Sequence, residues 1–255
     1  MAERKREKIQ RERTAGGFVA EEKRKTNLDL WIPKTEIGRK VKNGEIKDIN
    51  EIIERGIKIL EPEIVDMLIP NLELSIIGVG QSKGKFGGGK RSIWRQTQKK
   101  TSEGNKPKFA IVIAVGNRDG YVGIGKGKAK ETVPARGKAT RNAKLNIITV
   151  RRGCGSWECE CGESHSVPFK VEGKSGSVRM QLLPAPKGTG LCVEKECKKI
   201  LELAGFKDLY SRTVGQTRTK LNHVYACFNA LKKLGEMRIT EEYRKKAGIR
   251  EGRNE

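Results

Sequence analysis

The spacing of apolar residues in the first half of the chain predicts short helices followed by strands. Between residues 49 and 68 apolar side chains recur at helical spacing on both sides of Pro62, which predicts one or two short helices. We expect residues 92–97 and 109–115 to pair as strands, separated by a polar loop at 98–108. The second of these segments, FAIVIAV, is nearly continuously apolar, as is typical of a central strand covered by a helix.

A turn, a third strand and a longer helix are expected next. Residues 117–120 form the turn and residues 121–125 the strand. Thr132 is a suitable N-cap, and Pro134 falls in the first helical turn, where proline is tolerated. We therefore expect a helix from this point to about Leu145.

This helix has two contrasting faces. Small side chains share one face and basic side chains share the other. Small residues allow close packing on a sheet. The basic face lacks acids four residues away, which favours a phosphate-bearing partner over a merely solvated surface. The small residues are Ala135, Ala139 and Ala143, and the basic ones are Lys138, Arg141 and Lys144.

The second half of the chain predicts the order β, β, β, α, β, α, which is an α+β arrangement. A loop at 184–190 precedes the first helix of this half. The expected strands are 146–150, 167–171, 177–183 and 209–214, and the expected helices cover 193–204 and 224–234.

Composition divides the chain into four parts. Residues 1–47 are charged and poorly periodic, so we expect a basic extension that is mobile on its own. Residues 48–146 and 147–235 form two domains, and residues 236–255 are expected to be a flexible charged tail. The glycine-rich run 78–89 is too flexible to hold its own structure.

The charge balance points to a polyanionic partner. The chain has 255 residues and a formal net charge of +23, from 54 Lys and Arg against 31 Asp and Glu. That excess is larger than solubility requires, and nucleic acid is the first candidate. We expect no membrane partner, because no run of 18 apolar residues occurs. We also expect no secretory leader, and therefore a cytoplasmic protein with reduced cysteines.

Two segments match part of a nucleotide-binding phosphate loop. Residues 120–126 fit Gly-x4-Gly-Lys, but Gly127 stands where Ser or Thr would bind Mg²⁺. Residues 84–90 fit the same pattern and fail in the same way at Arg91. An RNA-binding β-hairpin explains residues 115–131 better, and a nucleotide-dependent RNA enzyme is the alternative. No paired catalytic carboxylates or catalytic cysteine environment accompany these segments, so we predict no enzymatic activity.

Three cysteines and a histidine form a candidate metal site. Cys154-x4-Cys159-x-Cys161-x3-His165 lies in a glycine-containing loop that can bend around an ion. Three thiolates and one imidazole make a closed tetrahedral set for Zn²⁺ with no open catalytic position. The spacing differs from paired Cys-x2-Cys knuckles, so reduced, solvent-facing thiols are the alternative.

The remaining cysteines and the second histidine suggest no site by their sequence context. Cys197 and Cys227 fall on apolar helix faces, which favours burial as small hydrophobic residues. The role of Cys192 stays open. His223 begins the last helix, and we expect it at the surface or at an interface.

Five segments in order between residues 109 and 231 make the chain closely resemble the small-subunit ribosomal protein S-five family, in its archaeal and eukaryotic branch and with an archaeal-like cysteine loop. The segments are GNRDGYVGIGKGKAKE at 116–131, KLNIITVRRG at 144–153, HSVPFKV at 165–171, GSVRMQLLPAPKGTGL at 176–191 and GQTRTKLNHVYACFNAL at 215–231. The glycine-rich run 78–89 departs from the pattern of this family.

The resemblance implies a double-stranded-RNA-binding-like α-β-β-β-α domain and an α+β domain with a left-handed βαβ crossover. It implies a non-enzymatic constituent of the cytoplasmic small ribosomal subunit that binds rRNA and supports assembly. It further implies a place near the messenger entry channel with an influence on decoding accuracy, neighbours of the S-four and S-eight families, and zinc in the cysteine loop. A free double-stranded-RNA-binding protein is a further alternative.

Carried over by position, the resemblance implies which basic residues contact RNA. The hairpin loop at 98–108 would lie nearest the messenger. The candidate RNA-binding residues are Lys90, Arg91, Arg95, Lys99, Lys100, Lys106, Lys108, Lys126, Lys128, Lys138, Arg141 and Lys144, and the candidate metal ligands are Cys154, Cys159, Cys161 and His165.

Overall fold

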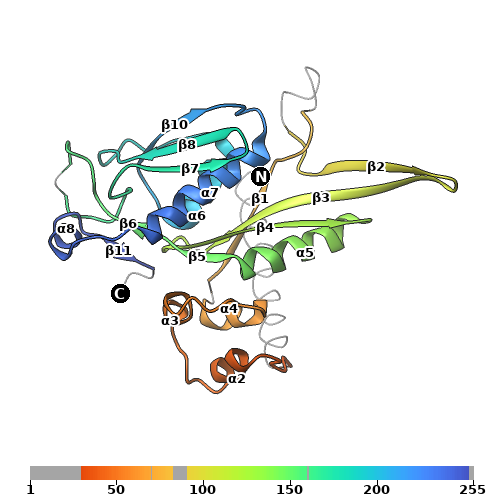
Figure 1. Cartoon of the computed structure of the whole chain (residues 1–255), viewed down its shortest axis with the longest axis horizontal. Helices are drawn as coiled ribbons and strands as arrows, with labels where there is room; N and C mark the ends of the chain where they lie inside the picture. The colour runs from red at the N-terminus through yellow and green to blue at the C-terminus, as the bar shows by residue number, and fades with distance from the viewer. Residues whose placement is uncertain (1–29, 70, 83–90, 160, 253–255) are drawn as a thin grey trace, which may run out of the picture.

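The computed structural model describes residues 30–69, 71–82, 91–159 and 161–252. Two antiparallel-rich sheets are packed with helices, and a long hairpin arm projects from the first sheet (Figure 1). The α+β class predicted from the sequence is confirmed. Lys90 and most of the glycine-rich run lie outside the described residues.

Three short helices precede the first sheet: α2 (Glu36–Lys42), α3 (Ile49–Glu54) and α4 (Pro62–Leu68). The last two confirm the apolar periodicity, and Pro62 occupies the first turn of α4. Helix α2 is a correction, because we expected no regular structure before residue 48. It forms where Thr35 caps its N-terminus and Val41 packs into the core.

The first sheet contains β1 (Glu73–Ile77), β2 (Arg95–Thr101), β3 (Gly104–Gly116), β4 (Tyr121–Ala129) and β5 (Ile147–Thr149), all antiparallel. Strand β2 pairs with the first half of β3, and β1 pairs with its second half. Strand β4 pairs with the other edge of β3. Strand β1 was not predicted.

Two predictions about this sheet are wrong. The expected loop at 98–108 is the outer part of β2 and β3, joined by a tight turn at residues 102–103. The polar side chains of this segment favoured a loop, because strands are recognised by alternating apolar residues. A two-stranded arm exposed to solvent has no such alternation beyond its base. The strand predicted to begin the second domain is β5, which pairs with β4 and completes the first sheet.

Helix α5 (Thr132–Leu145) covers one face of the first sheet. The helix lies where it was predicted, but Thr132 is its first residue and Glu131, not Thr132, occupies the N-cap position. Ala135, Ala139 and Ala143 are fully buried against the sheet, which confirms the small-residue face.

The second sheet has the order β7-β8-β10-β9 and consists of β7 (Val171–Ser175), β8 (Val178–Leu183), β9 (Leu191–Cys192) and β10 (Leu209–Val214). Strands β9 and β10 are parallel and are connected through α6 (Lys195–Ala204). The strand predicted at 167–171 starts only at Val171. Its earlier residues include Pro168, which has no N–H for a strand ladder.

The two sheets share one hydrophobic core. Helix α6 packs on β1, β3 and β4, and α7 (Lys220–Glu236) packs on β7 and β8. Ile77, Val112 and Ile124 of the first sheet therefore belong to the same buried cluster as Ile200 and Leu231 of the helices. Each face of the first sheet is thus covered at its base, by α5 on one side and by α6 on the other.

The C-terminal residues up to 252 are ordered against the fold, which corrects the predicted flexible tail. Helix α8 (Glu241–Lys246) is followed by β11 (Arg250–Glu251), which pairs with β6 (Arg151–Arg152). The Tyr243 hydroxyl donates a 2.6 Å hydrogen bond to the Pro168 carbonyl. Ala247 and Ile249 are buried. Two apolar residues are too few to form a periodic pattern, so the sequence did not indicate that this segment packs on the fold. Among the described helices, none has the length and apolar character to span a membrane.

Candidate nucleic-acid interface and cysteine cluster

The glycines of the phosphate-loop-like segment face helix α5. A Cβ added to Gly123, Gly125 or Gly127 would stand within 2.1–2.3 Å of backbone atoms of α5. Real Cβ atoms do not approach backbone so closely, so only glycine permits this sheet–helix distance. The Gly-x4-Gly-Lys match at 120–126 runs into strand β4 and is not a cradle loop. Its glycine spacing serves packing.

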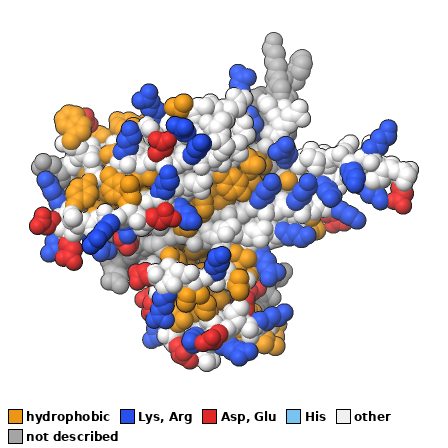
Figure 2. Space-filling model, in the orientation of Figure 1, with side chains coloured by type: hydrophobic (Ala, Val, Ile, Leu, Met, Phe, Trp, Pro, Cys, Tyr) orange, Lys and Arg blue, Asp and Glu red, His pale blue; other side chains and the backbone are white. Residues whose placement is uncertain are grey.

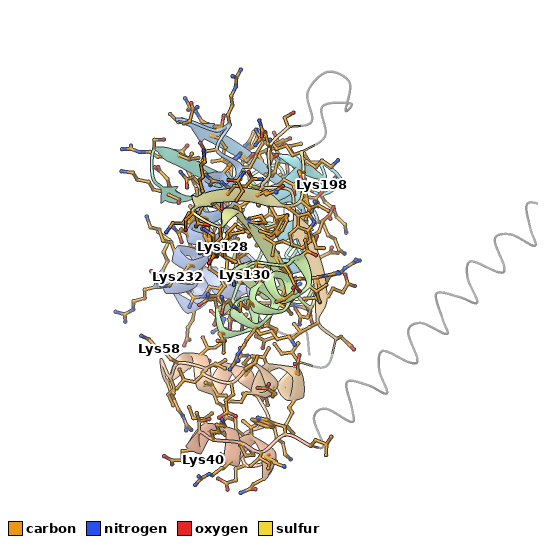
Figure 3. All side chains as sticks on the ribbon, turned by 90° about the vertical axis from the view of Figure 1, so that its right-hand side faces the viewer. Lys40, Lys58, Lys128, Lys130, Lys198 and Lys232 are labelled. Atoms are coloured by element: carbon orange, nitrogen blue, oxygen red, sulfur yellow. The ribbon has the colours of Figure 1, made fainter. Side chains whose placement is uncertain are left out.

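Lys126 and Lys128 alternate with these glycines and therefore point to the opposite face of β4. The pairing register puts Ala110 of β3 opposite Lys128, and Arg95 of β2 opposite Ala110. All three cations are exposed, and they line one hollow of about 250 Å³ whose apolar wall includes Leu221 at the start of α7. In Figure 3, which looks toward the arm, Lys128 lies between the α5 layer and the second sheet.

The same face continues outward along the arm. Lys99 pairs directly with Lys106, and Lys108 pairs with Thr97, so all three lysines share the face of Lys126. Lys100 pairs with Asn105 on the other face. Figure 2 shows Lys and Arg side chains along the projecting arm, with an acidic side chain at its tip. We call Arg95, Lys99, Lys106, Lys108, Lys126 and Lys128 the basic face.

One acid neutralises part of the basic face. Glu103 in the turn pairs with Lys106 at 2.5 Å, and both side chains are exposed. Exposed pairs of this kind contribute little to stability and separate easily. Lys130, an exposed residue directly after β4, continues the alternation beyond the predicted set. Its signal in the sequence was the Lys126-x-Lys128-x-Lys130 spacing.

The basic residues of α5 form a separate surface on the other side of the sheet. Lys138 and Arg141 are exposed, as is Arg136, which we did not single out. Lys144 differs, because its side chain is 18% exposed and its Nζ lies 2.5 Å from Oδ2 of Asp66 on α4. Lys144 therefore ties α5 to α4, and its charge already has a partner.

Arg91 also has a structural contact. Its Nη2 donates a 3.2 Å hydrogen bond to the Arg218 carbonyl, next to the start of α7. Residues 82 and 91 form an isolated bridge at the base of the run that the structure does not describe. Lys90 lies outside the described residues.

The four predicted metal ligands come together. One ligand atom from each of Cys154, Cys159, Cys161 and His165 lies within 4.8 Å of all the others. The Sγ of Cys159 is 3.8 Å from Nε2 of His165, which is close to the separation of ligand atoms around a tetrahedral Zn²⁺. The loop brings together the donor set that its spacing indicated.

His165 is held by a carboxylate that the sequence did not reveal. It is 2% exposed, and its Nδ1 lies 3.0 Å from Oδ2 of Asp208, although this contact lacks hydrogen-bond geometry. The other oxygen of Asp208 accepts the backbone N–H groups of Gly188 and Gly190 at 3.0 and 2.8 Å. A carboxylate behind a histidine commonly orients its other nitrogen toward a metal. Asp208 precedes β10, far along the chain, so spacing could not find it.

The thiols of the cysteine loop differ in acidity. A backbone hydrogen bond from Lys187, followed by the neighbouring Cys161, lowers the pKa of Cys159 to about 6. Burial, followed by the neighbouring thiols, raises the pKa of Cys154 to about 11. The loop is anchored at its base, because the Cys154 N–H donates to the Ala247 carbonyl at 2.8 Å.

The predictions for the remaining cysteines and for His223 had different outcomes. Cys197 and Cys227 are fully buried, as predicted, and Cys192 is exposed. His223 is a correction, because it is buried at 3% exposure and not at the surface. Its position in the first turn of α7 faces α6, which sequence spacing does not show.

The chain is similar in sequence to known proteins. The description "Ribosomal protein S5, N-terminal domain" matches residues 93–151, and "Ribosomal protein S5, C-terminal domain" matches residues 173–244. The chain is 51% identical over 226 residues to a protein of Nanoarchaeum equitans named "Small ribosomal subunit protein uS5", covering 89% of this chain and 97% of that protein. The chain belongs to the ribosomal protein S5 family.

Other archaeal members are similarly close. The protein of the same name from Methanocaldococcus jannaschii is 48% identical over 227 residues, covering 89% of this chain and 98% of the relative. That of Staphylothermus marinus is 48% identical over 208 residues, with 82% and 90% covered. Membership confirms the archaeal type of the resemblance stated from the sequence.

Proposed function

We propose that the protein is a non-catalytic constituent of the small ribosomal subunit that acts in the cytoplasm by binding rRNA. The observation that carries this proposal is the basic face, a row of cations on a rigid sheet, together with relatives named for the small ribosomal subunit. Lysine and arginine neutralise phosphates with little dependence on sequence. The position of the protein would then come from the assembled particle.

The RNA contacts belong to this proposal. The basic face would bind one stretch of backbone and the α5 surface another, because the two lie on opposite sides of the sheet. Arg91 and Lys144 would contribute less, since each already has a partner in the protein. The proposed contacts are Lys90, Arg91, Arg95, Lys99, Lys100, Lys106, Lys108, Lys126, Lys128, Lys138, Arg141 and Lys144.

Finer features of the family belong to the proposal as well. Strands β1, β3 and β4 with α5 support a double-stranded-RNA-binding-like domain, and the parallel pair β9 and β10 around α6 supports a βαβ crossover, whose left-handed sense belongs to the proposal. We further propose contact with messenger RNA near the entry channel through the arm, an influence on decoding accuracy, a role in assembly, and neighbours of the S-four and S-eight families. The division into domains 48–146 and 147–235 is part of the same proposal, except that β5 at the start of the second range completes the first sheet.

Sedimentation tests the main proposal. Tagged protein expressed in an archaeal host is separated on a gradient at moderate salt, and we expect it in the small-subunit peak. Recovery free of ribosomal particles but bound to duplex RNA would support the free RNA-binding alternative and contradict a ribosomal role. A tagged protein with the basic face changed to alanine serves as the matched control, and we expect less of it in the peak.

We also propose that Cys154, Cys159, Cys161 and His165 hold a structural Zn²⁺. The convergence of four donors and the carboxylate behind His165 support it. Zinc would hold the loop closed, and it would supply no catalysis, because four protein ligands leave no open position. Two contacts join the loop region to the C-terminal segment: Cys154 donates to the Ala247 carbonyl, and Tyr243 donates to the carbonyl of Pro168, which follows the loop. We therefore expect the metal to stabilise the C-terminal segment as well.

Elemental analysis of purified protein tests the zinc site. We expect Cys159→Ser to lose about one equivalent of zinc relative to wild type, since it removes one of four ligands. The exposed Cys192→Ser is the control and should keep the wild-type content. Equal zinc in Cys159→Ser and wild type would overturn the assignment.

A further inference from the structure

A second group of metal-binding side chains lies where α6 and α7 begin. Ligand atoms of Glu194, Cys197 and His223 all lie within 4.8 Å of one another. Glu194 is the N-cap of α6, Cys197 is in its first turn, and His223 is in the first turn of α7. The three residues are separate from the cysteine loop, and no motif in the sequence joins them.

The ring of His223 is buried within this group. Within the part of the chain that the structure describes, neither Nδ1 nor Nε2 of its buried ring has a hydrogen-bond partner. A neutral imidazole carries one N–H and one lone pair, and burying either without a partner is unfavourable. A cation bound to one nitrogen would use the lone pair that is now unmatched.

Glu194 already holds a cation at this place. Its Oε2 accepts the backbone N–H groups of Glu196 and Cys197 at 3.0 and 3.4 Å, which fixes the carboxylate. Its Oε1 lies 2.9 Å from Nζ of Lys220, whose side chain is 21% exposed. A metal ion at this oxygen would displace the partly exposed ammonium, which would turn to solvent. The carboxylate is then free to bind a metal ion without moving.

The sulfur of Cys197 completes the group. It is fully buried and lies 3.9 Å from the backbone carbonyl oxygen of His223, so the two helix starts are in contact here. Cys227 is also fully buried and neighbours Cys197, but its sulfur is not one of the ligand atoms that lie within 4.8 Å of one another.

We propose that Glu194, Cys197 and His223 form a second site for a divalent cation of the Zn²⁺ type. Mixed sulfur, nitrogen and oxygen ligands suit Zn²⁺ and disfavour Mg²⁺ and Ca²⁺, which require oxygen. The fourth ligand is a water molecule. When three protein ligands bind, the thiol proton of Cys197 passes to solvent, and the carboxylate and thiolate together balance the two positive charges. The ion fixes the start of α6 to the start of α7, independently of the RNA-binding role.

Cobalt binding to a variant without the loop site tests this proposal. In full-length Cys159→Ser/Cys161→Ser protein, stripped of metal by a chelator, we expect about one Co²⁺ to bind with the absorption of a tetrahedral, thiolate-ligated ion. Adding His223→Gln should abolish that absorption. Zn²⁺ should raise the melting temperature of the first variant and leave that of the second unchanged.

The controls separate metal binding from folding. Cys192→Ser in the same background removes an exposed thiol and should leave Co²⁺ binding intact. If His223→Gln does not fold, Glu194→Gln replaces it, because an amide oxygen can still cap α6 and binds metal poorly. Failure of the loop-deficient protein to bind Co²⁺, or an unchanged spectrum in both Glu194→Gln and His223→Gln, would overturn the second site.

Discussion

Strand β4 has two faces whose residues alternate along the chain and serve opposite purposes. Gly123, Gly125 and Gly127 bring the sheet against α5, while Lys126 and Lys128 on the other face point toward the hollow beside Arg95. The glycines act through the absence of a side chain and the lysines through the length of theirs. The Gly-x-Gly-Lys-Gly-Lys pattern therefore results from packing on one face and charge on the other. It resembles a phosphate loop in the order of its residues but not in its structure.

The two faces also differ in how their polar groups are balanced. The helical layer on the glycine face is tied by Asp66 to Lys144 and by the buried Glu61. The described part of the basic face contains only Glu103 as a paired acid, at the outer turn. The buried polar groups on the glycine side are thus balanced within the protein, while the basic face, like the outer surface of α5, leaves its charge for a partner.

The strongest test of this difference is Gly125→Val. Its Cβ would stand 2.1 Å from the Ala143 nitrogen and 2.2 Å from the Ala139 carbonyl oxygen, so α5 must move away from the sheet. We expect a loss of roughly 3 kcal/mol or more in the free energy of unfolding. Chemical denaturation measures it, and a loss below about 1 kcal/mol would show that close packing is not the reason for the glycine.

Gly137→Ala is the matched control for this substitution. Gly137 lies in α5, and a Cβ there meets no atom within 4 Å. Alanine is the better helix former, so we expect a gain of about 0.5–1 kcal/mol. Opposite signs for the two substitutions would confirm that the β4 glycines and the α5 glycine have different roles.

A smaller loss is expected from the buried carboxylate on the helical side. Glu61 is 8% exposed and accepts the backbone N–H groups of Lys34 and Thr35 at 2.9 and 2.7 Å. Burial alone would raise the pKa of Glu61, but these hydrogen bonds outweigh it and the pKa lies below the ordinary 4.5. Glu61→Gln should cost about 1–3 kcal/mol at neutral pH, because it replaces charge-assisted hydrogen bonds with neutral ones.

The pH dependence of this loss follows from the lowered pKa. The folded protein binds a proton at Glu61 less readily than the unfolded chain does, so the contribution is complete above 4.5. It disappears as the pH falls through the folded-state pKa. Unfolding of wild type and Glu61→Gln is measured between neutral and acidic pH, with the exposed Glu45→Gln as control. A difference that stays constant down to the acid limit would contradict this assignment.

Substitutions on the basic face should have the smallest effect on stability and a clear effect on RNA binding. Lys126→Ala/Lys128→Ala should change stability by less than about 0.5 kcal/mol, because both side chains are exposed. The affinity of this double variant for duplex RNA should fall about tenfold at moderate salt. The slope of log affinity against log salt concentration should become shallower by about one to two. Fluorescence titrations over a salt series measure both.

Two lysines on other elements provide the control for charge itself. Lys58, before α4, and Lys198, on α6, are exposed and removed from β4 in sequence, as labelled in Figure 3. Lys58→Ala/Lys198→Ala removes the same charge from the chain. An equal loss of RNA affinity in this variant would mean that net charge, and not the basic face, drives binding.

Long periodic segments were predictable, while short or polar ones were not. Strands β3, β8 and β10 and helices α5, α6 and α7 carry enough apolar repeats to identify them from local sequence. Strands β6, β9 and β11 have two residues each and exist only through their partners. Helix α8 has no buried residue of its own, and it is held by the Tyr243 hydrogen bond and by the buried residues that follow it.

The sites divide in the same way. The donors of the cysteine loop are close in sequence, so their spacing indicated a metal site directly. Asp208 behind His165, and the meeting of Glu194 and Cys197 with His223, join residues from distant elements. Nothing in the local sequence marks such pairs, because helix packing brings them together.

By itself, the sequence determined that this is a basic α+β protein of the S5 family with a cysteine loop and a glycine- and lysine-rich strand. Local periodicity, charge and spacing are properties of residues close together in the sequence, so they can be recognised without knowing the fold. Only the tertiary structure decided that the glycines face α5, that Lys144 is paired, and that His223 is buried beside Cys197. Each of these depends on which element covers which face, and that is set by the shared core.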